Sequence, residues 1–218
     1  MIETLMQYVP ALPALGAFAA AALVLTLTPG PDMTLFLGKA VAVGRMAGFA
    51  AFFGALTGLF VHLIFAAVGI SALLAASPQA FLVLKIAGAA YLLWLAVQAL
   101  RKGSGLTLDP ADKRPEPMGA IFLSGLGINL LNPKIILFFV TFLPQFVSPA
   151  DPHASGKIAF LGLFFIVLAI PICMSMIVAA DRIADRLKKS PWMVRAVDWT
   201  FAGVMGAFAV RLLAARAG

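Results

Sequence analysis

TPGPDMTLF, residues 28–36, interrupts a long apolar segment with two prolines, a glycine and a carboxylate. Pro29 and Pro31 each remove a backbone donor, and Gly30 adds conformational freedom, so a regular helix is not expected to continue through them. Apolar residues resume at Met33, and proline is favoured at the first position of a helix. The motif therefore predicts a helix that is broken in two, with a second half that begins at Pro31.

The composition around this motif is that of a membrane protein. Of the 218 residues, 62% are hydrophobic and 11% are charged, whereas a soluble domain carries about 25% charged residues. The chain lacks the polar surface that water requires, so the bilayer is its expected solvent. We predict an all-α integral membrane protein with a single transmembrane domain over residues 1–218.

Six apolar segments are long enough to cross a hydrocarbon core of about 30 Å, which takes roughly 20 helical residues. Between the third and the fourth lies RKGSGLTLDPADKRPEP, residues 101–117, whose polar composition is typical of a linker. It separates two predicted halves of three helices each, residues 1–100 and 118–218. The six segments are residues 11–37, 46–75, 80–100, 118–147, 156–180 and 197–214.

The basic residues indicate the orientation of these helices. The net charge is +7, and eleven Lys and Arg fall on one side of the six segments against four on the other. Because positive charge favours the cytoplasmic side, residues 101–117 are predicted in the cytoplasm and both termini outside. A five-span arrangement would reverse the N-terminus and stays open. Since the charge lies between apolar segments, a nucleic-acid partner is not expected.

A second motif repeats the first. LLNPKIILF, residues 130–138, aligns without gaps on residues 28–36 and places Pro133 on Pro31, with three identities in all. Each motif lies in the first helix of a half. Two similar halves with an odd number of helices must be inverted relative to one another, and inverted repeats with broken helices recur among secondary transporters. We therefore predict two inverted three-helix repeats, whose first helices are each broken at a proline motif.

The two motifs place opposite charges at membrane depth. Asp32 follows Pro31 where a carboxylate suits the positive end of the helix dipole, so it either stabilises this helix start or binds a ligand. An ionisable group in the membrane costs roughly 2.5–3.5 kcal/mol. Lys134 follows the candidate N-cap Asn132 and Pro133, and it faces the wrong end of the dipole. Its predicted partner is Asp32, an anion such as a substrate carboxylate, or the membrane interface, reached by its long side chain.

Broken helices expose backbone groups, which a membrane tolerates only beside protein or a water-filled cavity. Two breaks at similar places in the two halves therefore predict a polar cavity between the halves, with a chemistry that suits a zwitterion. The α-carboxylate would meet half-helix amides and Lys134, and the α-ammonium would meet Asp32. The residues predicted to bind substrate or protons are Thr28, Gly30, Asp32, Asn129, Asn132 and Lys134.

Three further features of the sequence bear on the function. His62 is either a packing residue or a proton relay, since its unperturbed pKa suits that role. Gly54 and Gly58 form a GxxxG motif, which indicates close helix packing within the subunit or in a homodimer. Cys173 is the single cysteine, and no group of Cys, His and carboxylates has metal-ligand spacing. No cofactor is therefore expected.

Three stretches carry a resemblance to a known family. They are TPGPDMTLFLGKAVAVGRMAGFAAFFGALTG (28–58), KIAGAAYLLWLAVQALR (85–101) and NPKIILFFVTFLPQF (132–146). In this order they resemble the LysE/RhtB superfamily of amino-acid exporters, specifically the RhtB (homoserine/threonine resistance) branch. The resemblance implies a proton-driven exporter in the bacterial inner membrane. The matching motif positions are Thr28, Pro29, Gly30, Pro31, Asp32, Asn132, Pro133 and Lys134.

The predicted function is proton-coupled secondary export of amino acids, with small neutral substrates such as threonine, homoserine or leucine. No GxxxxGK(S/T) phosphate loop occurs in the sequence, so an ATP-driven pump would need another subunit. The alternatives are a passive channel for small solutes, an assembly subunit and a membrane-embedded enzyme. An enzyme is not expected, because two histidines and one cysteine offer little for a nucleophile–base pair.

Overall fold

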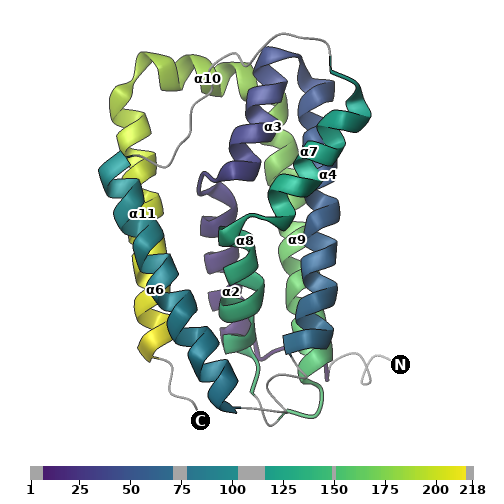
Figure 1. Cartoon of the computed structure of the whole chain (residues 1–218), viewed down its shortest axis with the longest axis vertical. Helices are drawn as coiled ribbons and strands as arrows, with labels where there is room; N and C mark the ends of the chain where they lie inside the picture. Colours follow the sequence, from purple (N-terminus) through teal and green to yellow (C-terminus); the bar gives the residue numbers. More distant parts are fainter. Residues whose placement is uncertain (1–6, 71–77, 103–115, 149–150, 215–218) are drawn as a thin grey trace.

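The computed structural model describes residues 7–70, 78–102, 116–148 and 151–214, and these are helical, with no strand among them. The helices run along one long axis, except for α10, which lies across one end (Figure 1). Two short π-helices, η1 and η2, and one 3₁₀ helix, η3, extend α4 and α8. The elements are α2 (Leu12–Leu27), α3 (Pro31–Ala42), α4 (Arg45–Phe65), η1 (Ala66–Ile70), α6 (Pro78–Lys102), α7 (Met118–Leu130), α8 (Pro133–Leu137), η2 (Phe138–Phe142), η3 (Leu143–Phe146), α9 (Ala154–Val178), α10 (Ala180–Lys189) and α11 (Pro191–Ala214).

The two predicted helix breaks are confirmed. Pro31 is the first residue of α3 and Pro133 the first residue of α8, as expected for proline at the first helical position. The pair α2 and α3 bends by 48° at its break, and so does the pair of α7 with the helical residues 133–146. Along the chain, α2 and α3 rise toward the end where α10 lies, whereas α7 and α8 descend from it (Figure 1).

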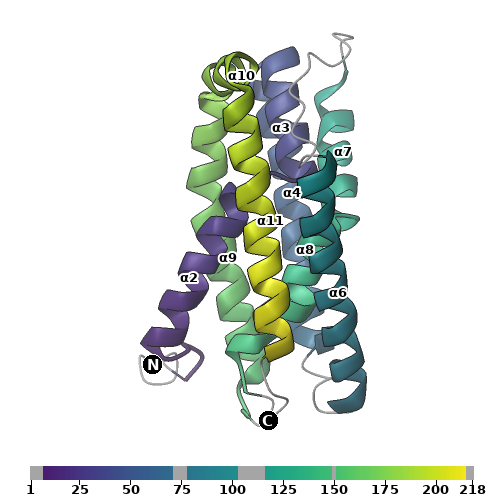
Figure 2. The same ribbon diagram turned by 90° about the vertical axis from the view of Figure 1, so that its left-hand side faces the viewer.

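Two helices are long and apolar enough to cross a membrane alone, Arg45–Gly69 and Ala154–Val178. If each bent pair counts as one span, the described residues hold up to four candidate spans. The helices α6 and α11 run along the same axis and pack side by side (Figure 2). They occupy the places of the third and sixth predicted helices, and α6 contains the shorter apolar stretch Ile86–Arg101.

The start predicted for the sixth helix was wrong. The fifth helix, Ala154–Val178, agrees with the predicted residues 156–180, but a separate helix, α10, follows it, so that α11 begins at Pro191 and not at residue 197. The reason is that α10 is amphipathic: Ala180 and Ala184 are buried, whereas its aspartates and arginines at positions 181, 182, 185 and 186 are exposed. A helix of this kind lies in the plane of a membrane interface. The first bent pair also extends to Ala42, past the predicted end at residue 37.

Glycines bring α4 and α7 into backbone contact. A Cβ on Gly54 would lie 1.9 Å from the carbonyl oxygen of Phe122, and one on Gly125 would lie 2.0 Å from that of Ala51. Only glycine allows such an approach, which is typical of helix pairs in membranes. The GxxxG motif of Gly54 and Gly58 therefore packs within the subunit, the first of its two predicted roles.

The hydrophobic core is divided into two clusters along the long axis. One surrounds α8 and η2 and includes Phe18 and Phe165. The other lies toward α10 and includes Phe36 and Phe52. The pair α6 and α11 joins the first cluster, where Gly88 packs so closely on Thr141 that a Cβ would lie 2.6 Å from its methyl carbon. The boundary between the two clusters lies at the depth of the helix breaks.

Candidate functional site

A pocket lies where the two breaks meet. The described residues that line it come from α2, α3, α4, α7, α8 and α9 and from the breaks themselves, and none of them comes from α6 or α11. All six residues predicted to bind substrate or protons line this pocket: Thr28, Gly30, Asp32, Asn129, Asn132 and Lys134.

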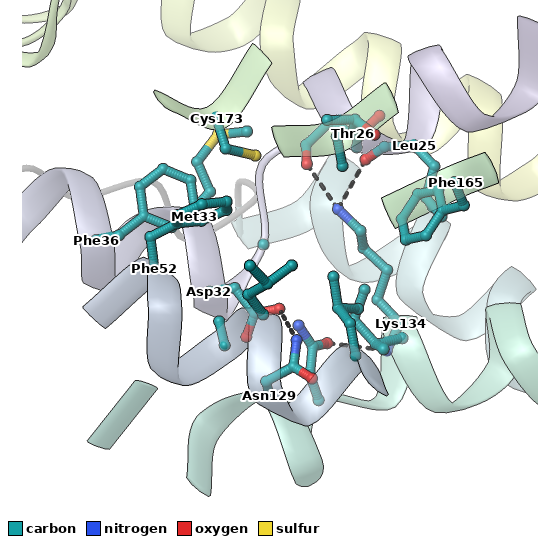
Figure 3. Close-up of a pocket in the computed structure, with 18 residues that line it drawn as sticks. Leu25, Thr26, Asp32, Met33, Phe36, Phe52, Asn129, Lys134, Phe165 and Cys173 are labelled. Atoms are coloured by element: carbon teal, nitrogen blue, oxygen red, sulfur yellow. Dashed lines mark hydrogen bonds between the residues drawn. The ribbon is translucent and has the colours of Figure 1, made fainter. Parts of the chain in front are cut away.

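Lys134 is anchored at the end of another helix. Its ammonium donates to the carbonyl oxygens of Leu25, at 3.0 Å, and Thr28, at 2.7 Å. Both belong to the C-terminal end of α2, where the helix dipole is negative. The carbonyl of Leu25 also accepts from the backbone N–H of Thr28. A cation is unfavourable at the start of α8, but here its charge lies where α2 stabilises it (Figure 3).

This arrangement decides between the predicted partners of Lys134. Escape to the membrane interface is wrong, because only 9% of the residue is exposed. A direct ion pair with Asp32 is also wrong. Among the described residues, ion pairs join Lys39 to Glu116 and Lys157 to Asp151, and none joins Lys134 to Asp32. Since an ammonium has three donors and two are used, one N–H of Lys134 is left for a ligand.

Asp32 has one oxygen bound and one oxygen free. Its Oδ2 accepts a hydrogen bond of 2.7 Å from the side-chain amide of Asn129. Its Oδ1 is buried and forms no hydrogen bond of good geometry within the described ranges, although the side chain of Asn132 lies close to this carboxylate. A buried carboxylate oxygen without a donor is costly, so this atom marks a place where a ligand, a water molecule or a proton would be stabilised.

The two asparagines have different tasks. Asn132 is the N-cap of α8, and its Oδ1 accepts from the backbone N–H of Lys134 at 3.0 Å, which confirms the predicted cap. Asn129 is 1% exposed and lies against Gly58, where a Cβ would be 2.4 Å from its Oδ1. The absence of that Cβ lets α4 and α7 approach closely enough for Asn129 to reach Asp32.

His62 lies outside the pocket wall. Its Nε2 is 3.2 Å from the carbonyl oxygen of Asn129, and its ring stacks on Phe139 with a centroid distance of 5.9 Å. These contacts support the packing role that was one of its two predicted roles. They also place His62 beside the backbone carbonyl of Asn129.

Thr28 and Gly30 contribute shape more than polar contacts. The hydroxyls of Thr26 and Thr28 donate to carbonyls one turn earlier in α2, so the hydrogen of each is already used. Gly30 is extended, with φ −165°, and a Cβ there would lie 3.4 Å from the ammonium of Lys134. The glycine therefore keeps the path of Lys134 to α2 open.

The sequence reasoning missed the apolar wall of the pocket. The helical spacing of three and four residues could have revealed it, because residues on one face of α4 recur at that spacing. In Figure 3, Met33, Phe36, Phe52 and Cys173 lie close together, on the side of the pocket away from Lys134. The apolar lining residues are Met33, Phe36, Phe52, Ala55, Leu56, Leu59, Phe165, Ala169 and Cys173, together with Leu25 and Ile135.

The sequence matches the description "LysE type translocator" over residues 23–216, which cover both breaks and every residue of the pocket. The chain belongs to the LysE type translocator family. It is accordingly a membrane transporter and not an enzyme, as the sequence predicted. The membership also confirms the resemblance drawn from the proline motifs.

Similar proteins with names come from several bacteria. The chain is 30% identical over 200 residues to a homoserine/homoserine lactone efflux protein of Salmonella typhimurium, which covers 92% of this chain and 96% of that protein. It is 32% identical over 148 residues to a leucine efflux protein of Salmonella choleraesuis, with 68% and 66% covered. An uncharacterized membrane protein of Vibrio cholerae is 34% identical over 137 residues, with 63% and 66% covered. No solved structure matches the chain.

Proposed function

We propose that this translocator exports small neutral amino acids across the bacterial inner membrane in exchange for protons, and that it binds them as zwitterions at the two helix breaks. Two of its relatives are named as efflux proteins, for homoserine and its lactone and for leucine. Both names describe export of amino acids or their derivatives. The chemistry of the pocket supports the same class of substrate.

The observation that carries the proposal is a pair of unused polar groups in one pocket. Asp32 has a buried Oδ1 without a donor in the described structure, and Lys134 has a third N–H beyond its two carbonyl acceptors. An α-ammonium group would donate to Asp32, and an α-carboxylate would accept from Lys134. A zwitterion supplies both groups at a fixed short spacing, so one bound molecule would satisfy both ends.

The proposed proton exchange rests on a single carboxylate that would bind either a proton or the ammonium group of the substrate. Asp32 is the single carboxylate among the described residues that line the pocket. Its charged form attracts an ammonium, whereas its protonated form does not. Substrate and proton would therefore occupy Asp32 in turn, so that inward proton movement drives outward movement of the amino acid.

The proposed topology is six spans in two inverted repeats, with residues 101–117 in the cytoplasm. The equal bends of 48° in the two broken pairs and their opposite directions (Figure 1) support an inverted repeat. Under this topology, Lys39 and Glu116, paired at 2.7 Å, join the two halves at the cytoplasmic end. Division of the core into two clusters at the depth of the pocket suits a transporter that opens one end at a time.

The test is transport by purified protein in liposomes. Vesicles would be loaded with one amino acid, and efflux of its radiolabel would be followed with and without an imposed pH gradient. We expect saturable efflux that a protonophore reduces, and loss of about 100-fold or more in Asp32→Asn, since a buried charge contact to substrate is worth about 3 kcal/mol. Asp185→Asn, which neutralises an exposed aspartate on α10, is the matched control and should transport normally.

Three results would contradict the proposal. Flux that neither saturates nor responds to the protonophore would indicate a passive channel. Undiminished coupled transport in Asp32→Asn would remove the carboxylate from the mechanism. Absence of flux for every amino acid tested, with protein shown to be folded, would favour an assembly subunit.

A further inference from the structure

The polar groups of the pocket gather around the two breaks. Those with capacity left include the Oδ1 atoms of Asp32 and Asn129 and one N–H of Lys134, while the side-chain oxygen of Asn132 is already used as the N-cap. The hydroxyls of Thr26 and Thr28 donate to the backbone of α2, and their oxygens can still accept. The charged head of an amino acid requires the free groups that remain.

The opposite wall offers a substrate side chain no strong hydrogen-bonding partner. Met33 and Phe36 come from α3 and Phe52 from α4, and the rings of Phe36 and Phe52 pack edge to face at 5.9 Å. These three side chains are 3–5% exposed. Cys173, beside them in Figure 3, is a weak donor. The wall belongs to the hydrophobic cluster near α10, so its apolar surface continues behind the pocket.

The division between these walls has a direct consequence for selectivity. Given the amino-acid export proposed above, we infer that the substrates carry apolar side chains of the leucine, isoleucine, valine and methionine class, and that hydroxylic and charged side chains are disfavoured. A side chain that extends from the polar wall enters the space in front of Met33, Phe36 and Phe52. It loses its water there and gains apolar contacts.

Each competing class fails at this wall for a separate reason. A hydroxyl group would give up hydrogen bonds to water without a replacement, and hydrophobic pockets discriminate against an added hydroxyl by up to about 100-fold. A cationic side chain would need a second carboxylate, whereas Asp32 is the one acid that the described residues present to the pocket. An apolar side chain pays neither cost. The inference places the chain with its leucine efflux relative in substrate preference and not with the homoserine relative.

Counterflow in liposomes tests the inference without any substitution. Vesicles would be loaded with unlabelled leucine, and uptake of a trace of labelled leucine would be challenged with external leucine, methionine, valine, threonine, homoserine and lysine. We expect the apolar amino acids to compete at similar concentrations. Threonine and homoserine should require roughly 10- to 100-fold more, and lysine should not compete.

A variant locates the selectivity in the wall. Met33→Gln places an amide of nearly the same size in the pocket, and we expect it to shift the ratio of leucine to homoserine transport toward homoserine by about tenfold. Met174→Gln is the matched control, because Met174 is a partly buried residue of the same cluster that does not line the pocket. It should leave the ratio unchanged. Phe52→Tyr, which adds a single hydroxyl, replaces Met33→Gln if the latter does not fold.

The outcomes separate this inference from the proposed function. Exchange of amino acids with homoserine or threonine equal to leucine would overturn the inference and leave the export function standing. An unaltered substrate ratio in both wall variants would also overturn it. Absence of exchange for every amino acid would instead count against the export function itself.

Discussion

The two helix breaks have similar backbones and yet use their charged residues differently. At the first break, Asp32 lies in the first turn of its own helix, α3, where the dipole favours a carboxylate. At the second, the neutral side chain of Asn132 caps α8, and the ammonium of Lys134 extends to the end of α2. Both charges therefore lie at the first break. Asp32, from the first half of the chain, is at the start of α3, and Lys134, from the second half, binds the end of α2.

The difference teaches that a charge at a helix end must be judged against every helix end within its reach. Judged by α8 alone, Lys134 faces an unfavourable dipole. Judged by the whole molecule, it supplies donors to the carbonyl of Thr28 and to that of Leu25, which also accepts from the backbone N–H of Thr28. The bond also crosses the pocket region and ties the second half of the chain to the first.

The largest expected effect comes from Lys134→Met, which removes the shared charge. It would leave the carbonyl of Thr28 buried without a donor, at about 1–3 kcal/mol, while the carbonyl of Leu25 keeps the backbone N–H of Thr28. We expect the free energy of unfolding to fall by about 1–3 kcal/mol and transport to be lost. Thermal unfolding in detergent and efflux from liposomes would measure the two effects. Unchanged stability would show that the second break does not support the first.

Combining this change with Asp32→Asn distinguishes a carbonyl anchor from an ion pair. If Lys134 mainly paired with Asp32, neutralising both residues would recover most of the lost stability. We expect no such recovery, because the orphaned carbonyl of Thr28 remains in the double variant. A double-mutant cycle on the unfolding free energy measures this coupling, and a recovery of more than half of the loss would contradict the geometry described above.

The next prediction tests whether Asn129, just before the second break, orients Asp32 at the first. In Gly58→Ala, the added Cβ would lie 2.4 Å from Oδ1 of Asn129 and displace the amide that binds Asp32. We expect efflux to fall by about tenfold, the value of one hydrogen bond to a charged group. Gly127→Ala is the control, since a Cβ there meets nothing within 4 Å. Equal transport by the two variants would show that Asn129 does not orient Asp32.

A smaller effect is expected from His62→Gln, because His62 contacts the backbone of Asn129 beside the second break and does not line the pocket. The variant keeps a polar group near the carbonyl of Asn129 but loses the stack on Phe139. We expect stability to fall by about 1 kcal/mol and efflux to change by about threefold or less, with the same pH dependence. A displaced pH optimum would instead assign His62 the proton-relay role.

The smallest effect concerns a residue remote from both breaks. Lys157 donates to Asp151, as does the backbone N–H of His153, and these bonds hold the pKa of the Asp151 carboxyl below its ordinary value. A depressed folded-state pKa stabilises the protein at neutral pH, and the stabilisation is lost as pH falls through that value. Asp151→Asn should thus lower Tm slightly at neutral pH and not in acid. A Tm difference that grows in acid would reverse the sign.

Local chemistry made the breaks predictable. Proline at the first helical position and asparagine at the N-cap act within a few residues, so the starts of α3 and α8 and the role of Asn132 could be read from the sequence. The partners of Lys134 could not, because Leu25 and Thr28 lie 109 and 106 residues away in the chain. Only the packing of α8 beside α2 brings them together.

The apolar wall of the pocket and α10 were predictable only in part. Their patterns are local, since Met33 and Phe36 follow Asp32 at helical spacing and the charges after Ala180 alternate with apolar residues. What the pattern does not report is the surface that each face meets. The same spacing describes a face toward lipid, toward a neighbouring helix or toward a ligand.

Cys173 gives the pocket a built-in chemical reporter. It is the single cysteine among the 218 residues, and it lies in the pocket wall near Met33 and Phe36. A thiol-reactive spin or fluorescent label therefore has one position at which to react, and because Cys173 is buried, the label reaches it only when the pocket opens. Protection by bound substrate would measure occupancy, and labelling by impermeant reagents added to one side of the membrane or the other would measure how often the pocket opens in each direction.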